Sequence, residues 1–293
     1  MSTPPDDNPT AETAAADEAA LDAAADLIAG ADALLICAGA GMGVDSGLPD
    51  FRGDEGFWRA YPPYARLGLS FVEVADPVHF AGDPELAWGF YGHRLELYRR
   101  TTPHAGFAIL RDWGSAKPGG VHVFTSNVDG QFQRAGFRDV AEVHGSIHHL
   151  QCLAGCGAGI WPADDVTVTV DEATMRALPP LPECHECGGP ARPNILMFGD
   201  FDWLGERTQR QLDALKEWRR RAGNIVVVEL GAGLAVPTVR RQAELMSAAT
   251  GALIRINPRE PDVRHGRGIS IARGALDALT AIRARLGSHP SAT

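Results

Sequence analysis

The sequence contains no apolar run that approaches the roughly 20 residues needed to span a bilayer, so we expect no membrane partner. Its first 30 residues hold seven acidic residues and neither Lys nor Arg, so the basic segment that opens a signal peptide is missing as well. We therefore expect a cytoplasmic protein. A basic stripe is also lacking, and without those seven acids the formal charge of −10 would be about −3. This balance argues against nucleic acid as a partner.

The dehydrogenase fingerprint G-x-G-x-x-G is absent too. Residues 39–53 read GAGMGVDSGLPDFRG, and the third residue after the second glycine is Val44. A glycine-rich turn after a buried strand still indicates a nucleotide site, because glycine lets backbone N–H groups approach a pyrophosphate closely. The missing third glycine disfavours hydride transfer as the reaction.

Four apolar runs alternate with helical patterns and predict strands, at residues 33–38, 121–125, 225–230 and 252–256. Near-continuous apolar strands separated by helices are typical of a parallel sheet covered on both faces. We expect an α/β fold: a Rossmann-like parallel sheet with helices on both faces, plus a small zinc-binding module and a helical insertion. The carboxyl ends of the four strands would meet at one edge, where open α/β sheets bind ligands.

The chain divides by composition into a core domain, an insertion, a small module and two loose ends. The expected ranges are a disordered acidic tail at 1–15, a first part of the Rossmann-like nucleotide-binding domain at 16–149 with the helical insertion at 54–103, the zinc-binding module at 150–192, the second part of the domain at 193–286 and a frayed C-terminus at 287–293. The insertion is rich in aromatic residues and would close over one side of the crevice. Ala and Leu periodicity predicts a first helix near residues 16–30, ended by Gly30.

Four of the five cysteines form two closely spaced pairs flanked by glycine. Cys152 and Cys156 make the first pair, and 27 residues separate it from the second pair, Cys184 and Cys187. Such pairs suit a tetrahedral zinc site with four thiolates, which has no open position for water and would therefore be structural. Because no secretory signal is visible, disulfides are the poorer interpretation, and reduced core cysteines are a further alternative. The fifth, Cys37, lies in a predicted buried strand and is expected to be a core residue.

Polar side chains follow the second predicted strand and recur shortly afterwards. Ser126, Asn127 and Asp129 come directly after this strand, and His144 stands beside a glycine. Such groups at a strand's carboxyl end can orient a ligand, and a histidine can transfer protons near neutral pH. On its own, however, a histidine is more often structural or exposed, and this chain has ten.

Taken in order, these motifs resemble those of the sirtuins, the NAD-dependent protein deacylases. Residues 39–53 resemble Gly-Ala-Gly followed by Ser-Gly-Ile-Pro-Asp-Phe-Arg, the segment TSNVDG resembles Thr-Gln-Asn-Ile-Asp-Gly, and EVHGS resembles (Glu/Leu)-x-His-Gly-Ser. The four cysteines stand at the place of the sirtuin zinc module, and residues 192–200 resemble Arg-Pro-x-(Val/Ile)-Val-x-Phe-Gly-Glu. The histidines at 148–149 have no counterpart in these motifs and are expected at the edge of the zinc module. The resemblance runs from about residue 25 to about residue 285.

The resemblance implies that NAD, as a co-substrate, and an acylated lysine protein meet in the crevice. Phe51, Arg52 and Asn127 would surround the nicotinamide ribose, and Asp129 would hold the carboxamide. The acyl oxygen would attack the ribose C1′ as nicotinamide leaves, and His144 would then deprotonate a ribose hydroxyl, giving free lysine and O-acyl-ADP-ribose. The catalytic residues implied are His144 and Asn127, and the NAD-binding residues implied are Gly39, Ala40, Gly41, Asp50, Phe51, Arg52, Ser126, Asn127, Asp129, Gly231, Ala232, Gly233 and Asn257.

The resemblance also implies where the acylated lysine binds. In sirtuins the segment at 192–200 forms one wall of the acyl-lysine tunnel, so the implied substrate contacts here are Ile195, Leu196, Phe198 and Gly199. Tyr91 and Arg94 in the insertion are also candidates, because their spacing places them on one helix face, where they could clamp a carboxylate. This pair resembles the Tyr-x-x-Arg of class III desuccinylases and predicts desuccinylation beside deacetylation. The alternative is a surface arginine with a packing tyrosine, since the pattern arises easily by chance.

Five positions depart from the sirtuin motifs. Ser126 replaces a glutamine, Met42 and Gly43 replace small or hydroxyl residues, and Ala232 and Gly233 replace Thr and Ser. Each lost hydrogen bond would weaken NAD binding by about 0.5–1.5 kcal/mol. We therefore expect ordinary or weak NAD affinity with catalysis intact.

Two other functions stay open at this point. An NAD-cleaving enzyme or mono-ADP-ribosyltransferase on the sirtuin scaffold would let water or a protein side chain replace the acyl oxygen, and it would release nicotinamide without an acylated peptide. A non-catalytic NAD or ADP-ribose sensor is disfavoured, because a pure binder has no need of His144. We expect a monomer.

Overall fold

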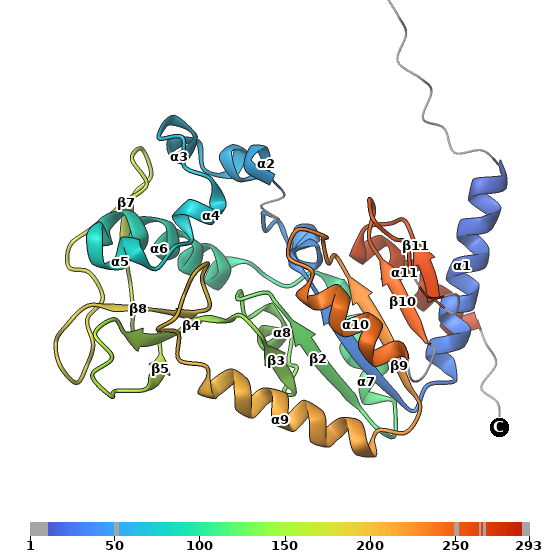
Figure 1. Cartoon of the computed structure of the whole chain (residues 1–293). Helices are drawn as coiled ribbons and strands as arrows, with labels where there is room; N and C mark the ends of the chain where they lie inside the picture. The colour runs from blue at the N-terminus through green and yellow to red at the C-terminus, as the bar shows by residue number, and fades with distance from the viewer. Residues whose placement is uncertain (1–10, 50–52, 249–251, 264, 266–267, 289–293) are drawn as a thin grey trace, which may run out of the picture.

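The computed structural model describes residues 11–49, 53–248, 252–263, 265 and 268–288 (Figure 1). A parallel sheet lies at the centre of the larger lobe, with its six strands in the order β11-β10-β9-β1-β2-β3. The strands are β1 (Ala33–Ala38), β2 (Val121–Thr125), β3 (Val140–Glu142), β9 (Ile225–Leu230), β10 (Leu253–Ile256) and β11 (Gly268–Ile271). The chain thus runs outward from β1 to β3, then returns to the other side of β1 and continues to β11. The predicted Rossmann-like α/β fold is confirmed.

Helices cover both faces of this sheet. On one face lie α1 (Ala11–Ala29), α7 (Ala105–Ser115) and α11 (Ala275–Ser288), and on the other lie α9 (Glu206–Arg221) and α10 (Thr238–Ala248). In β1, Leu34 and Ile36 join the first core, whereas Leu35 and Cys37 join the second. Since both faces are buried, the strand needs no polar alternation and reads as a continuous apolar run. Within the described ranges, no helix is long and apolar enough to cross a membrane.

The central strands follow the sequence prediction closely. The strands predicted at 33–38, 121–125 and 225–230 have these bounds, and the fourth begins one residue later than predicted, at Leu253. The sequence analysis predicts neither β3 nor β11. Both are edge strands, of three and four residues, and are too short to show a pattern.

Both ends of the described chain are more ordered than predicted. Helix α1 begins at Ala11, so the expected disordered tail is wrong for residues 11–15; alanine is the strongest helix former and fills this segment. Helix α11 continues through Ser288, past Gly287, where we expected fraying. Ion pairs hold this end of the chain to α1: Arg273, just before α11, pairs with Asp17 at 2.5 Å, and Arg285 of α11 pairs with acidic residues of α1.

The predicted helical insertion and the cysteine module form one smaller lobe, residues 53–100 and 145–195 (Figure 1). The insertion contains α2 (Gly53–Ala60), α3 (Pro62–Arg66), α4 (Phe71–Val74), α5 (Val78–Gly82) and α6 (Pro84–Arg100). The module contains the antiparallel sheet β5-β4-β8, made of β4 (Gly145–Cys152), β5 (Ile160–Pro162) and β8 (Ala191–Ile195), and the hairpin β6 (Thr169–Asp171) and β7 (Arg176–Leu178). Trp88 Nε1 on α6 donates to the Ala191 carbonyl over 3.1 Å, and the Tyr64 hydroxyl donates to the Met175 carbonyl. The two segments therefore share one aromatic core.

Candidate active site

Two glycine-bearing loops meet at the carboxyl edge of the sheet, between β1 and β9, where the strand order changes direction. The Gly39 N–H donates to the Leu230 carbonyl and the Gly41 N–H to the Gly231 carbonyl, each over 3.0 Å. A Cβ at Gly39 would lie 2.7 Å from Ala232 Cα, and a Cβ at Gly231 would lie 2.4 Å from Gly41 Cα. Only glycine allows the two backbones to approach this closely. In open α/β sheets this switch point is where ligands bind.

The first loop continues into a short 3₁₀-helix, η1 (Ala40–Ser46). The Met42 side chain is fully buried in the core between the sheet and its helices, and the Met42 carbonyl accepts a hydrogen bond from His104 Nε2 at 2.9 Å. Met42 therefore faces the core.

Asn127 joins the end of β2 to the glycine turn. Its Nδ2 donates to the Gly39 carbonyl over 3.0 Å, and its backbone N–H donates to Thr125 Oγ1 over 3.0 Å. The Thr125 hydroxyl in turn donates to the Ala38 carbonyl, as does the Ser126 N–H. These bonds bring Asn127, Ser126 and the glycine turn together, as predicted for groups at neighbouring strand ends.

Asp129 lies in the turn that follows, before the short helix α8 (Gln131–Arg134). Its Oδ1 accepts a hydrogen bond from the Gln131 N–H at 2.8 Å. Burial raises the pKa of the Asp129 carboxyl to about 6, although the Gln131 hydrogen bond and the charge of Arg94 lower it. Perturbed carboxyl groups of this kind are concentrated at functional sites.

His148 reaches this turn from β4. Its Nε2 bonds the Asp129 carbonyl at 2.9 Å, across 19 residues of sequence. His148 lies on a strand of the cysteine module, in keeping with the expectation, and it also contacts the turn after β2. No sequence signal marks this contact, because it depends on how β4 passes the turn.

His144 lies just beyond the carboxyl edge of the sheet. The preceding Val143 N–H donates to the Thr125 carbonyl at 2.9 Å, and the His144 carbonyl accepts from the Leu196 N–H at 2.9 Å. The next residue, Gly145, has φ +77°, and a Cβ there would lie 2.1 Å from the Asn194 carbonyl oxygen. Burial lowers the pKa of His144, so the ring is neutral at pH 7 and can accept a proton. Within the described ranges no hydrogen bond to its ring nitrogens is found.

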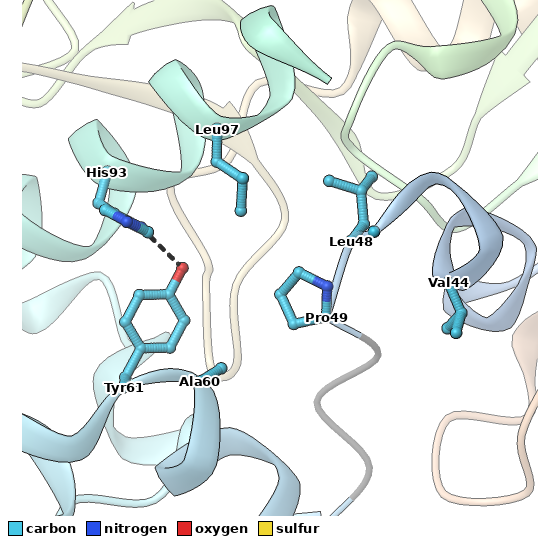
Figure 2. A pocket seen from close by; sticks show the side chains of 8 residues that line it. Val44, Leu48, Pro49, Ala60, Tyr61, His93 and Leu97 are labelled. Carbon is cyan, nitrogen blue, oxygen red and sulfur yellow. Dashed lines mark hydrogen bonds between the residues drawn. The ribbon is translucent and has the colours of Figure 1, made fainter. Parts of the chain in front are cut away.

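A cavity of about 370 Å³ separates the first loop from the helical insertion (Figure 2). Leu48 and Pro49 of the glycine motif line one side, and Tyr61, His93 and Leu97 line the other. The Tyr61 hydroxyl and His93 Nδ1 are hydrogen-bonded at 3.1 Å.

Three of the predicted NAD contacts lie outside the described residues: Asp50, Phe51 and Arg52.

Helix α6 carries Tyr91 and Arg94 on one face, as their spacing predicts. The Arg94 Cζ lies 5.7 Å from the centroid of the Tyr91 ring and 5.0 Å from that of Phe90. Arg94 Nε donates to the Tyr98 hydroxyl over 2.9 Å. Arg94 is only 7% exposed, so the alternative of a surface arginine is wrong. The carboxylate clamp stays a prediction.

The segment after β8 presents two apolar side chains to solvent. Leu196 and Phe198 are 36% and 39% exposed, whereas Ile195 is buried in the aromatic core. Arg192 and Asp200 close this segment by a bidentate ion pair, with N–O distances of 2.7 and 2.8 Å and side chains that are 1% and 0% exposed. The pair fixes the loop that carries the predicted substrate contacts.

We expect the substitution Asp200→Asn to lower the free energy of unfolding by about 3–5 kcal/mol, because it leaves the buried Arg192 charge without its counterion. Urea unfolding followed by circular dichroism measures the change. The matched control is Asp112→Asn, which breaks the exposed ion pair with Arg111 and should cost less than about 1 kcal/mol. Equal effects of the two substitutions would contradict the assigned role.

The second glycine loop and β10 supply the remaining predicted NAD contacts. Asn257 is buried; its Nδ2 donates to the Ala232 carbonyl over 2.9 Å, and its Oδ1 accepts from the Arg259 N–H. Ala232 is buried, whereas Gly233 is exposed. Asn257 thus holds the second loop in place, and a contact with the adenosine ribose stays a prediction.

The four cysteines meet at one point in the smaller lobe. Their Sγ atoms all lie within 4.8 Å of one another, with Cys152 and Cys187 at 3.7 Å and Cys156 and Cys184 at 3.6 Å. Zinc–sulfur bonds of about 2.3 Å in a tetrahedron place sulfur atoms about 3.8 Å apart. The donor set and its spacing therefore fit a zinc ion.

The family model "Sir2 family" matches residues 39–236, which is more than half of the chain and includes both glycine loops, His144 and the four cysteines. The chain belongs to the Sir2 family. This sirtuin is 33% identical over 249 residues to NAD-dependent protein deacylase 1 of Pseudomonas aeruginosa, covering 84% of this chain and 90% of the relative. It is 33% identical over 233 residues to NAD-dependent protein deacylase 1 of Archaeoglobus fulgidus, covering 78% and 82%.

The sirtuin fold is also found among solved structures. The structure of a Sir2 homologue–NAD complex superposes with a TM-score of 0.68 at 27% identity, covering 90% of this chain and 93% of that chain. A structure of Sir2 enzymes described in terms of their mechanism and regulation superposes with a TM-score of 0.66, covering 92% and 98%.

Proposed function

We propose that this sirtuin is an NAD-dependent protein-lysine deacylase, which moves the acyl group of a modified lysine to ADP-ribose and releases nicotinamide. One observation carries the proposal: a neutral His144, with no ring partner in the described ranges, lies beside the strand end that holds Asn127 and the glycine turn. A general base needs this protonation state and this access. Relatives named NAD-dependent protein deacylases support both the NAD requirement and a protein substrate.

The glycine turn offers one particular backbone donor to a phosphate. The N–H groups of Gly39, Gly41 and Met42 are already bonded to backbone carbonyls. The Ala40 N–H has no such partner in the described part of the chain, and Ala40 is exposed at the start of η1. We expect this N–H to bind the NAD pyrophosphate, which explains why glycines flank a small residue here.

The four cysteines would hold one structural zinc ion. All four donors are cysteine sulfurs, so the ion would have no open position for a substrate. Its contribution would be to join the ends of β4 and β8 and thereby fix the small lobe. We assign it no chemical step.

Arg94→Met is expected to lower kcat/KM for a succinyl-lysine peptide by about 10- to 100-fold while changing deacetylation less than about threefold, because a charge-assisted hydrogen bond contributes about 1.5–3 kcal/mol. Methionine keeps much of the side-chain volume against Phe90 and Tyr98. Arg94→Lys is the matched control: it keeps the charge but loses the bidentate fork, so its loss should be intermediate. Equal loss of desuccinylation and deacetylation would contradict the prediction that Tyr91 and Arg94 clamp a carboxylate.

The proposed function is tested by measuring nicotinamide release from NAD without peptide, with an acetyl-lysine peptide and with a succinyl-lysine peptide. Release that depends on an acylated peptide, together with O-acyl-ADP-ribose detected by mass spectrometry, supports deacylation. Release without peptide would instead indicate an NAD-cleaving enzyme, and ADP-ribose attached to protein would indicate a transferase.

A further inference from the structure

We propose that His148 is a positioning residue for nicotinamide recognition: its imidazole holds the Asp129–Gly130 turn by a hydrogen bond to the Asp129 carbonyl. This inference rests on the proposed function, in which Asp129 holds the nicotinamide carboxamide. It concerns a residue of β4 that the sirtuin motifs in this sequence do not include.

In the described part of the chain, several hydrogen bonds fix the Asp129 turn, and His148 supplies one from a side chain of another element. The Ile147 N–H of β4 donates to the Val128 carbonyl at 3.0 Å, and the Gln131 N–H donates to Asp129 Oδ1 at 2.8 Å. The Arg134 N–H donates to the Gly130 carbonyl at 3.0 Å, and His148 Nε2 lies 2.9 Å from the Asp129 carbonyl oxygen. Since a carbonyl can only accept, His148 must carry its proton on Nε2.

The His148 imidazole packs against the backbone at Gly130, which has no side chain to separate them. The φ of Gly130 is +71°, and a Cβ there would lie 2.7 Å from His148 Cδ2. The ring therefore packs directly on the peptide that follows Asp129. A substitution that removes the ring would lose both the hydrogen bond and this packing.

The Asp129–Gly130 turn and His148 border a cavity. This cavity, of about 310 Å³, is lined by Asp129 and His148 together with Arg99, Arg134 and Arg207. These arginines are held elsewhere: Arg99 by the carbonyls of the 163–166 loop, Arg134 by the Arg99 carbonyl and Arg207 by Glu142. Each of these arginines thus already makes another contact. We expect the turn, and the carboxyl it carries, to shift when the imidazole is lost.

The variants that test this are His148→Leu, which removes the donor, and His148→Gln, whose amide nitrogen can reach the same position. The matched control is His149→Leu, which removes a histidine that lines the same cavity from the neighbouring position, with no bond to the turn among the described contacts. All variants are compared with wild type for melting temperature before use.

Binding is measured by calorimetry with NAD and with ADP-ribose, which lacks the nicotinamide, and the inhibition constant of nicotinamide is measured in the deacylation assay. His148→Leu should raise the NAD dissociation constant and the nicotinamide inhibition constant by about 5- to 20-fold, the loss expected from one buried hydrogen bond with its packing. It should leave the ADP-ribose dissociation constant and the KM for peptide within about twofold. His148→Gln should recover most of the loss, and His149→Leu should resemble wild type.

Equal weakening of NAD and ADP-ribose binding by His148→Leu, or no recovery in His148→Gln at matched melting temperature, would overturn the inference and leave the proposed function standing. A wild-type protein that binds NAD no more tightly than ADP-ribose, and is insensitive to nicotinamide, would overturn both. Because calorimetry needs no turnover, the inference is tested even if the acyl substrate is misassigned.

Discussion

Replacing His144 with alanine is expected to lower the rate of peptide deacylation by about 100- to 10,000-fold, the usual contribution of a positioned general base. The side chain makes no hydrogen bond within the described ranges, so its removal should leave the fold and the zinc content unchanged. The rate is measured as product formation from an acetyl-lysine peptide under saturating NAD. Loss of activity with an unchanged melting temperature would assign a chemical role, whereas activity within tenfold of wild type would contradict it.

The pH dependence of kcat/KM gives an independent check on the same residue. Burial lowers the pKa of His144, so its neutral, active form persists below the ordinary histidine value of about 6.5, and activity should fall only at lower pH. Asp129, with a pKa of about 6, titrates in the same region. Asp129→Asn measured in parallel separates the two, because the acidic limb that belongs to His144 should remain in this variant. An acidic limb centred above pH 6.5 would contradict the assignment.

The strands of the large sheet could be predicted because burial on both faces removes the need to know which face each residue occupies. In β1 and β9 every residue is buried, so a run of apolar residues is enough, even though Glu229, which pairs with Arg255, interrupts the run in β9. The edge strand Val140–Glu142 has no such signal, since its three residues end in a glutamate that pairs with Arg207. Its place beside β2 is decided by tertiary contacts alone.

In the candidate site, too, some features could be predicted from the sequence and others could not. Motif order indicated that Asn127 and His144 follow strand ends at the edge of the large sheet and that the four cysteines converge in the smaller lobe. The contact from His148 to Asp129 and the burial of Met42 could not be predicted in this way. Both depend on which side of a backbone faces a neighbouring element, and one sequence carries no information on that.

Replacing Cys184 with serine is expected to abolish zinc binding and to unfold the small lobe rather than weaken it slightly. Structural zinc sites bind with apparent free energies of about 10–16 kcal/mol, which equals or exceeds the total stability of about 5–15 kcal/mol of a typical domain. Zinc content is measured by atomic absorption, and local order by hydrogen exchange with mass spectrometry. The control Cys37→Ala removes a cysteine from the sheet core and should keep one zinc ion per chain.

Because the chain forms two lobes, the location of the segments that lose protection from hydrogen exchange is more informative than the total number of exchanged amides. The aromatic core shared by the insertion and the module contains Tyr91, Trp88 and Leu150, so loss of zinc should expose α6 as well as β4 and β8. The six-stranded sheet packs against its own helices through two separate cores and should keep its protection. Deacylation should then be lost although the glycine loops stay folded, because α6 carries the predicted acyl contacts and β4 carries the His148 that bonds the Asp129 carbonyl. A zinc-free variant with protected β4 and β8 would show that side-chain packing, and not the metal, holds this lobe together.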